Sequence, residues 1–220
     1  MIIATPITTL IKMRTRIRIK IKTNRPAKSK KPLIIGIVGR RGSGKDTVAH
    51  YIAQKYNGKD ILLSDYIDRI LKIFHLPASR QNTCWLITKT RERFGKGILA
   101  RAVIGQVDSN GFAVYLINGI RLKRETEILR ERFGKFFILL SVVCENKIRL
   151  GRIKKREKEK FLRKDKINVS LKKFLEQEKK LVTEKEIPWL EKKANYTVEN
   201  NTGKKDLFEK INHLAKILKL

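Results

Sequence analysis

The chain is poor in cysteine and histidine, and it has no long apolar run. Its two cysteines, Cys84 and Cys144, give no disulfide framework and fit a reducing compartment, where a buried thiol is the expected role. Its three histidines, His50, His75 and His213, lie far apart and show no metal-binding spacing. No apolar run approaches the ~20 residues of a membrane-spanning helix. We therefore expect a cytoplasmic protein without a membrane span.

Acidic residues are absent from residues 1–31, which hold ten lysines or arginines. Within this segment, Arg14–Lys22 alternates apolar and basic residues, a pattern compatible with an edge strand, a surface-binding arm or a leader. The segment lacks the serine richness of a transit peptide, and Met13 is an alternative start. We predict that 1–31 is a basic extension, poorly ordered, which precedes a folded domain over 32–220.

Basic residues exceed acidic ones throughout the chain. The net charge is +31, and 42 basic residues against 21 acidic ones remain from Pro32 onward. Such a surface attracts polyanions, although a uniformly lysine-rich composition explains the excess equally well. No basic stripe carries the interleaved aromatic residues of single-strand binders. Nucleic acid is thus a partner that charge allows and no motif supports.

The segment Gly39–Thr47 is the most informative one. An apolar run at 33–38 precedes it and a helical pattern follows from Val48, so a glycine-rich loop joins a strand to a helix. Glycines let successive backbone N–H groups turn inward, and the helix N-terminus adds partial positive charge. Lys45 supplies an ammonium for the outer phosphates of a nucleoside triphosphate. The expected nucleotide-binding residues are Gly39, Arg40, Arg41, Gly42, Ser43, Gly44, Lys45, Asp46 and Thr47.

The residues expected to bind Mg²⁺ depart from the usual pattern. The position after the lysine, where Ser or Thr usually binds Mg²⁺, holds Asp46, and Thr47 follows it. A carboxylate is a hard oxygen ligand, so we expect Asp46 and Thr47 to hold the metal directly or through water. The third apolar run ends in Asn118, where an aspartate is expected. Because asparagine is uncharged, either Asp46 carries the metal, or catalysis is weak, or nucleotide is bound without fast turnover.

Strand and helix patterns alternate from Pro32, which predicts an α/β fold of three layers, with helices on both faces of a mainly parallel five-stranded sheet. We expect strands near 33–38, 60–63, 113–117, 136–142 and 195–199. We expect helices near 44–56, 65–74, 80–94, 96–107, 123–132, 145–159, 170–185 and 204–218. The helices within 65–107 would form an acceptor-side insertion, and the charged segment 149–170 would form a lid.

Several polar residues follow the predicted strands, where ligands of parallel sheets bind. Asp65 follows the second strand, and it either contacts an acceptor or caps a helix. Arginines also surround this edge and would offset charge on transferring phosphoryl oxygens. Those before or just after the third strand are Arg80, Arg91, Arg93, Arg101 and Arg121. Three more, Arg149, Arg152 and Arg156, share one helical face by their spacing, and such a face can fold over a nucleotide.

The loop Gly39–Thr47 resembles that of phage-type deoxynucleoside monophosphate kinases and dephospho-CoA-kinase-like proteins. The likeness covers about residues 32–218, and its further segments are Leu63–Asp65, Leu76–Asn82, Arg93–Arg101, Asn118–Arg121 with Glu127, and Ala194–Gly203. The resemblance implies a P-loop NTPase fold of the kinase type, with ATP as phosphoryl donor and Mg²⁺ as cofactor. It implies Lys45 on the phosphates, Asp65 and Arg80 near the acceptor, and Arg121 near the reacting phosphates.

The leading hypothesis is a small-molecule kinase that transfers the γ-phosphoryl group of ATP to dephospho-CoA or a (deoxy)nucleoside monophosphate. The expected catalytic residues are Lys45, Asp65, Arg121, Arg152 and Arg156, and those expected to bind the acceptor are Asp65, Arg80, Arg93 and Arg101. The two alternatives are a nucleotide-gated ATPase that acts on nucleic acid and a degenerate ATP-binding protein with little turnover.

Overall fold

The computed structural model describes residues 31–109, 111–160, 170–180 and 184–220. By the compactness of its contacts the chain divides into residues 1–30 and residues 31–220, and the second unit holds all the elements described below. The predicted basic extension lies outside the described residues, apart from Lys31.

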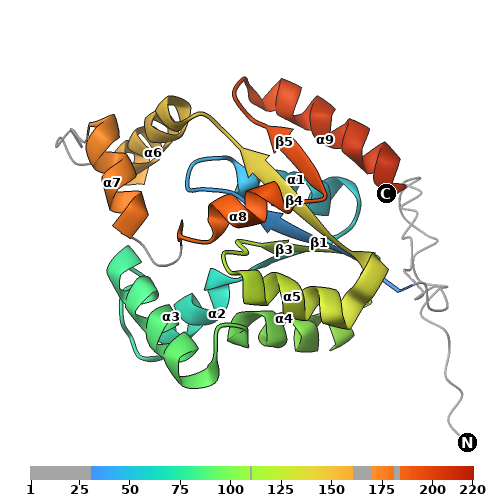
Figure 1. Ribbon diagram of the computed structural model, residues 1–220, viewed down its shortest axis with the longest axis horizontal. Helices are drawn as coiled ribbons and strands as arrows, with labels where there is room; N and C mark the ends of the chain where they lie inside the picture. The colour runs from blue at the N-terminus through green and yellow to red at the C-terminus, as the bar shows by residue number, and fades with distance from the viewer. Residues whose placement is uncertain (1–30, 110, 161–169, 181–183) are drawn as a thin grey trace, which may run out of the picture. The chain divides into compact units, whose positions relative to one another are not determined.

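Five parallel strands form the centre of the second unit (Figure 1). Along the sheet they lie in the order β2-β3-β1-β4-β5. In register, Ile35 of β1 lies opposite Leu116 of β3 and Ile138 of β4. Every residue of β3 is buried, as expected of a parallel strand that is covered on both faces. The strands are β1 Leu33–Val38, β2 Lys59–Leu62, β3 Val114–Asn118, β4 Phe137–Val143 and β5 Tyr196–Glu199.

Two helices, α1 (Lys45–Lys55) and α9 (Lys204–Leu218), cover one face of the sheet. Ile35 and Ile37 of β1 belong to one core cluster with Val48 of α1 and Ile211 of α9. The rings of Tyr51 and Phe208 stack between the two helices, with their centroids 3.9 Å apart. This packing fixes the start of α1 beside the carboxyl end of β1.

The opposite face is covered by helices from three parts of the chain. Ile34 and Val38 of β1 pack in a second core cluster with Ile67, Leu129 and Ile187. Gly36 lies between them, and a Cβ there would be 2.5 Å from the Ile120 side chain. The helices of this face are α2 Ser64–Ile73, α3 Arg80–Phe94, α4 Ile98–Ser109, α5 Lys123–Phe133 and α8 Ile187–Lys192.

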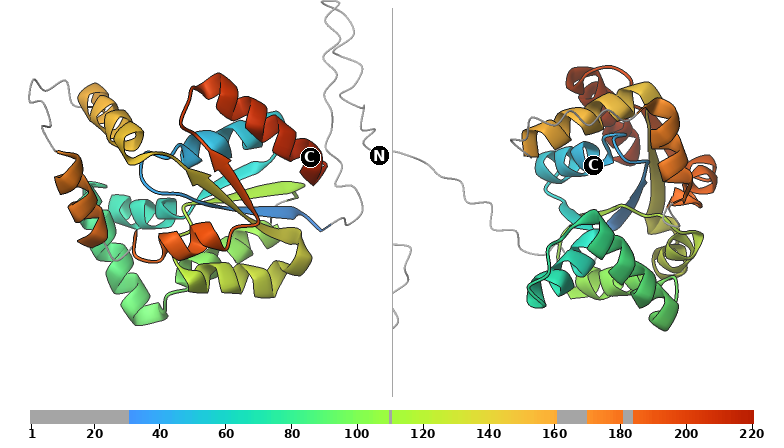
Figure 2. Two further views of the ribbon diagram at one scale, coloured as in Figure 1. Left: turned by 45° about the horizontal axis from the view of Figure 1, so that its top comes forward. Right: turned by 90° about the vertical axis from the view of Figure 1, so that its left-hand side faces the viewer.

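Two helices between β4 and β5 complete the unit. The helices α6 (Asn146–Lys160) and α7 (Leu171–Lys180) pack against each other, as Figures 1 and 2 show. A short 3₁₀ turn, Gly134–Phe136, precedes β4. Among the described residues, no helix combines the length and the apolar character that crossing a membrane would require.

The α/β class and the five-stranded parallel sheet are confirmed, and the expected strands agree with the structure to within one residue. The helix expected over 170–185 differs, because α7 ends at Lys180 and residues 181–183 lie outside the described part. The prediction also missed α8. This helix has six residues with Pro188 in its first turn, too few for a helical period to show in the sequence.

Candidate nucleotide-binding site

The segment between β1 and α1 forms a tight loop that leads directly into the helix. The Ser43 amide donates to the Arg40 carbonyl oxygen (3.0 Å), and the Val48 amide donates to that of Gly44 (3.0 Å). Gly42 and Gly44 have φ angles of 82° and 97°, in the left-handed region that side chains disfavour. The loop therefore places backbone amides and the first turn of α1 around one point, which suits an anion.

Two neighbouring segments pack so closely on this loop that positions 42 and 44 have no room for a side chain. A Cβ on Gly42 would lie 2.8 Å from the Arg149 carbonyl oxygen of α6, and one on Gly44 would collide with the Asn200 side chain. Asn200 follows β5 and is buried, and its Nδ2 donates to the Ser43 carbonyl oxygen (2.7 Å). The loop is thus held from the side of β5 as well as by its own turns.

Lys45 is the first residue of α1, and its side chain is almost fully buried. Its ammonium Nζ donates to Asp46 Oδ1 at 2.7 Å. Burial lowers the pKa of Lys45, Asp46 opposes this shift, and the positive charges of Arg121 and Arg156 add to it. A buried cation among other cations is poised to gain from an anionic ligand.

Asp46 is bound from two sides by Lys45 and Asn118. Asn118 is the last residue of β3, is buried, and donates from Nδ2 to Asp46 Oδ1 at 3.0 Å. Burial acts to raise the pKa of Asp46, but the Lys45 charge and the two hydrogen bonds hold it below its ordinary value. Asp46 is therefore a carboxylate at the pH of most cells, and half of its side chain is exposed.

The oxygen atoms around Asp46 fit a hard cation. Asn118 Oδ1 is buried and accepts no hydrogen bond from the part of the chain that the structure describes. Asp46 contributes a carboxylate beside it, and Thr47 contributes to the same cavity wall. Carboxylate, amide and hydroxyl oxygens are the donors that Mg²⁺ prefers, so these three residues are suited to hold it.

A cavity of about 430 Å³ opens at the loop. Its lining comes from the loop, α1, α6 and the beginning of α9, and it is rich in basic side chains. The residues are Gly42, Gly44, Lys45, Asp46, Thr47, Arg152, Lys155, Arg156, Asn200, Lys204 and Leu207. Five of these carry positive charge, so the cavity is suited to a polyanion such as a nucleotide.

Arg152 connects α6 to the loop through uncharged acceptors. Its Nη2 donates to Asn200 Oδ1 at 3.1 Å, and its Nη1 lies 3.5 Å from the carbonyl oxygens of Gly42 and Ser43. Because these acceptors are uncharged, they do not neutralise the positive charge of Arg152. Arg156, one turn further along α6, lines the same cavity and is exposed.

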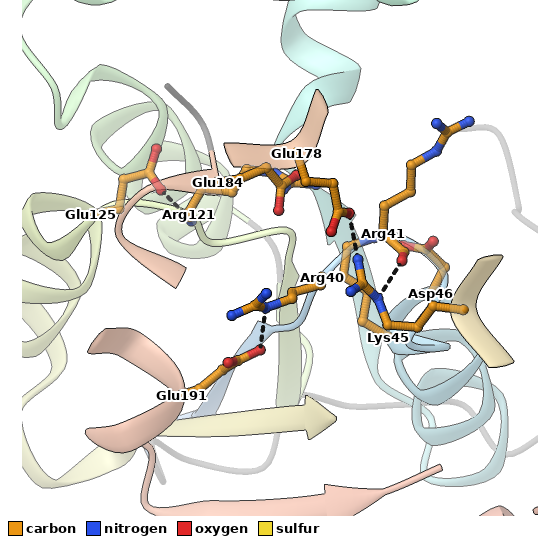
Figure 3. A network of polar contacts seen from close by, with 10 residues as sticks. Arg40, Arg41, Lys45, Asp46, Arg121, Glu125, Glu178, Glu184 and Glu191 are labelled. Carbon is orange, nitrogen blue, oxygen red and sulfur yellow. Dashed lines mark hydrogen bonds and ion pairs between the residues drawn. The ribbon is translucent and has the colours of Figure 1, made fainter. Parts of the chain in front are cut away.

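Three other arginines near the loop are bound by glutamates, as Figure 3 shows for Arg40 and Glu191. Arg149 is buried and donates to Glu178 of α7, and also to the Arg41 carbonyl oxygen at 2.9 Å. The remaining pairs are Arg121 with Glu184 and Arg40 with Glu191, the latter at 3.7 Å. The spacing predicted that Arg149 shares one face with Arg152 and Arg156. This prediction is wrong for Arg149, which does not line the cavity with the other two.

Glu125 of α5 contacts two of the arginines that the sequence singled out, Arg91 and Arg121. It is fully buried, and its carboxylate pairs with Arg91 at 2.7 Å and accepts the Arg121 backbone amide at 2.9 Å. Arg91 is thus engaged in the packing of α3 on α5. The same carboxylate fixes the backbone from which the Arg121 side chain extends.

The predicted acceptor residues are spread over α2, α3 and α4. Asp65, in the first turn of α2, is exposed and borders a second cavity of about 500 Å³. Burial and the neighbouring Asp68 raise the pKa of Asp65, and Arg69 opposes this. Arg93 and Arg101 are exposed, while the side chain of Arg80, the first residue of α3, lies outside what the structure describes.

The sequence did not single out Asn200, which lines the loop cavity, or Asp60, whose carboxyl is influenced by the charge of Asp46. Asn200 stands in the Asn-Asn-Thr-Gly turn after the last strand, and this turn was the signal available. Asp60 lies in β2, where burial together with Asp46 raises the pKa of its carboxyl to about 6. Its Oδ1 is buried with no hydrogen-bond partner among the described residues. Nothing in its local sequence separates it from an edge-strand polar residue.

The sheet order and the loop between β1 and α1 define a class: the chain has the fold of the P-loop kinases. It superposes on a shikimate kinase from Bacteroides thetaiotaomicron with a TM-score of 0.53 and 17% identity, over 86% of this chain and 99% of that one. It also matches the Mycobacterium tuberculosis APS kinase in complex with AMPPNP and APS, with a TM-score of 0.50 and 12% identity, over 87% and 100%.

In sequence, the chain is similar to proteins named UPF0200. It is 32% identical over 123 residues to that of Methanosarcina mazei, covering 56% of this chain and 65% of the relative. It is 31% identical over 128 residues to that of Methanothermobacter thermautotrophicus, covering 58% and 63%. The chain thus spans slightly less than two thirds of these curated relatives. No family model matches the chain.

Proposed function

We propose that the protein is a phosphotransferase that transfers the γ-phosphoryl group of ATP to a nucleotide-like small molecule. The observation that carries the proposal is the position of Lys45, which is buried at the start of α1 and opens onto a cation-lined cavity of about 430 Å³. A loop of glycine turns and a helix N-terminus at the same place are suited to the phosphates of a triphosphate.

The chain's own residues divide the work of such a reaction. The loop amides and Lys45 would hold the outer phosphates, and Arg152 and Arg156 would stabilise charge that develops on the transferring group. Asp65 would orient the acceptor, with Arg80, Arg93 and Arg101 on the acceptor side and Arg121 near the reacting phosphates. Asp46, Thr47 and Asn118 would hold Mg²⁺, which would supply positive charge to neutralise the phosphates.

Asn118 favours a second candidate, a protein that binds ATP with little turnover. The third strand ends in a neutral amide where a carboxylate usually supports the metal. Under this candidate, ATP affinity is retained and ADP forms slowly with every acceptor. The charge-based prediction of nucleic-acid binding also stays a prediction, since it rests on composition alone.

The test combines ATP with Mg²⁺ and each acceptor in turn, nucleoside monophosphates and dephospho-CoA, and follows ADP formation. We expect Lys45→Ala to lower turnover by about 10²–10³-fold, because a preorganised charge on the phosphates is lost. The matched control is Lys55→Ala, a lysine in the exposed last turn of the same helix. Unchanged phosphoryl transfer in Lys45→Ala contradicts the proposal, and ATP binding without turnover by the native protein selects the second candidate.

A further inference from the structure

Two positions next to the loop depart from their usual residue types. In P-loop proteins a hydroxyl residue after the lysine binds Mg²⁺, and an aspartate beyond a neighbouring strand supports it. Here the carboxylate belongs to Asp46 on the helix, and the uncharged side chain belongs to Asn118 on the strand. The two side chains contact each other, Nδ2 to Oδ1, at 3.0 Å. The pair therefore still contains one carboxylate, but this carboxylate stands at the start of α1 and not at the end of β3.

The moved carboxylate changes what a metal-free nucleotide meets. Asp46 lines the loop cavity with half of its side chain exposed, so its negative charge faces any phosphate that enters. It also binds the Lys45 ammonium at 2.7 Å, which neutralises the cation that the phosphates need. A hydroxyl at the same position would do neither. Without a divalent cation, the Asp46 carboxylate therefore opposes the attraction that the basic lining exerts on the outer phosphates, and it occupies the Lys45 ammonium.

A cation would reverse both effects. Asn118 Oδ1 is buried, accepts no hydrogen bond within the described part of the chain, and belongs to the side chain that contacts the Asp46 carboxylate. A hard cation between these oxygens would satisfy the orphaned amide oxygen and neutralise Asp46. Lys45 would then be released toward the phosphates. We propose that Asp46 and Asn118 form a cation-operated gate, so that a divalent metal strengthens triphosphate binding.

This inference rests on the proposed function, because it assumes that the loop binds a triphosphate. Its rival is a local role, since an acidic residue in the first turn of a helix stabilises that helix through the helix dipole. A local role predicts lower stability in variants and an unchanged metal dependence. The two readings therefore separate on binding measurements rather than on activity.

The experiment measures ATP-analogue binding by titration calorimetry in the presence of Mg²⁺ or of EDTA, with melting temperature as a check on folding. We expect Mg²⁺ to tighten binding by the native protein at least about tenfold, as the Asp46 charge is neutralised. In Asp46→Asn the ratio should fall below about threefold, mainly because metal-free binding improves. Glu209→Gln, on an exposed position of α9, is the matched control and should keep the native ratio.

A second readout uses Mn²⁺ bound beside the nucleotide, followed by electron paramagnetic resonance. Asp46→Asn should lose bound Mn²⁺, and the double variant Asp46→Ser with Asn118→Asp should regain it, because it places a hydroxyl on the helix and a carboxylate on the strand, as in the usual P-loop pattern. Equal native affinity with Mg²⁺ and with EDTA, while Lys45→Ala still abolishes binding, would overturn the gate and leave the proposed function standing. No triphosphate binding under either condition would overturn both.

Discussion

The arginines around the loop fall into two groups that differ in what binds them. Arg40, Arg121 and Arg149 are each paired with a glutamate, and these glutamates lie in α8, before α8 and in α7 respectively. Arg152 instead contacts carbonyl and amide oxygens, and Arg156 lines the open cavity. All five lie in or near one loop. Glutamates offset the charges of Arg40, Arg121 and Arg149, whereas the contacts of Arg152 and Arg156 described above do not offset theirs.

The difference shows that the partner, rather than the residue type, decides what an arginine does here. A buried ion pair is electrically neutral from a distance, and its main effect is to hold two elements together. Arg149 joins α6 to α7 and donates to the Arg41 carbonyl oxygen, so it stabilises the backbone of the loop. An arginine bound by neutral acceptors keeps its field and attracts an anionic ligand.

The largest expected effect separates the two groups by stability. Arg149→Ala would leave the carboxylate of Glu178, only 7% exposed, without its partner, and should lower the free energy of unfolding by about 3–5 kcal/mol. Urea unfolding measures this change. Replacing both partners by apolar residues, Arg149→Met with Glu178→Leu, should recover most of the loss. A loss below about 1 kcal/mol in the single variant would break the comparison, because Arg149 would then not be structural.

The next effect is one of affinity. Arg152→Ala should weaken ATP binding by about 10- to 100-fold, the value of one charge-assisted hydrogen bond to a phosphate. The free energy of unfolding of this variant should fall by less than that of Arg149→Ala, since the partners of Arg152 are uncharged and Asn200 Nδ2 keeps its hydrogen bond to the Ser43 carbonyl oxygen. Calorimetric titration with a nonhydrolysable ATP analogue and urea unfolding of the same sample measure both quantities. The opposite pattern, lower stability with unchanged affinity, would place Arg152 in the first group.

The sequence predicted the parts of this site that depend on neighbouring residues. An apolar run over 33–38 is followed by three glycines and a lysine within Gly39–Lys45, and local signals of this kind define strand, loop and helix directly. The spacing of Arg149, Arg152 and Arg156 likewise placed all three on one helix, α6. Their different roles were not predictable, because Glu178 reaches Arg149 from 29 residues further along the chain.

Asn200 and Asp60 illustrate the same limit. Each acquires its role from a contact or a charge brought by the fold, Asn200 through the Ser43 carbonyl oxygen and Asp60 through Asp46. A polar residue within an edge strand is common, so Asp60 carries no local signal, and the turn that contains Asn200 is a weak one because polar residues often follow a strand. Long-range pairing decides which polar residues become part of a site, and a single sequence does not show that pairing.

The smallest expected effect tests whether a paired arginine can be released. Arg121 is 22% exposed, and a phosphate that approaches it must compete with Glu184, which is 9% exposed. Glu184→Gln keeps the shape of the partner and removes its charge, so affinity for the ATP analogue should rise about threefold, with a stability loss of up to ~1 kcal/mol. Glu127→Gln, an exposed carboxylate of α5, makes the same charge change away from Arg121 and should leave affinity unchanged.

If Glu184→Gln lowers stability without raising affinity, Arg121 is a structural arginine like Arg149, and the paired group contributes nothing to ligand binding. If affinity rises, Glu184 restrains a residue of the site, and Arg121 belongs to the paired group only while no ligand is bound.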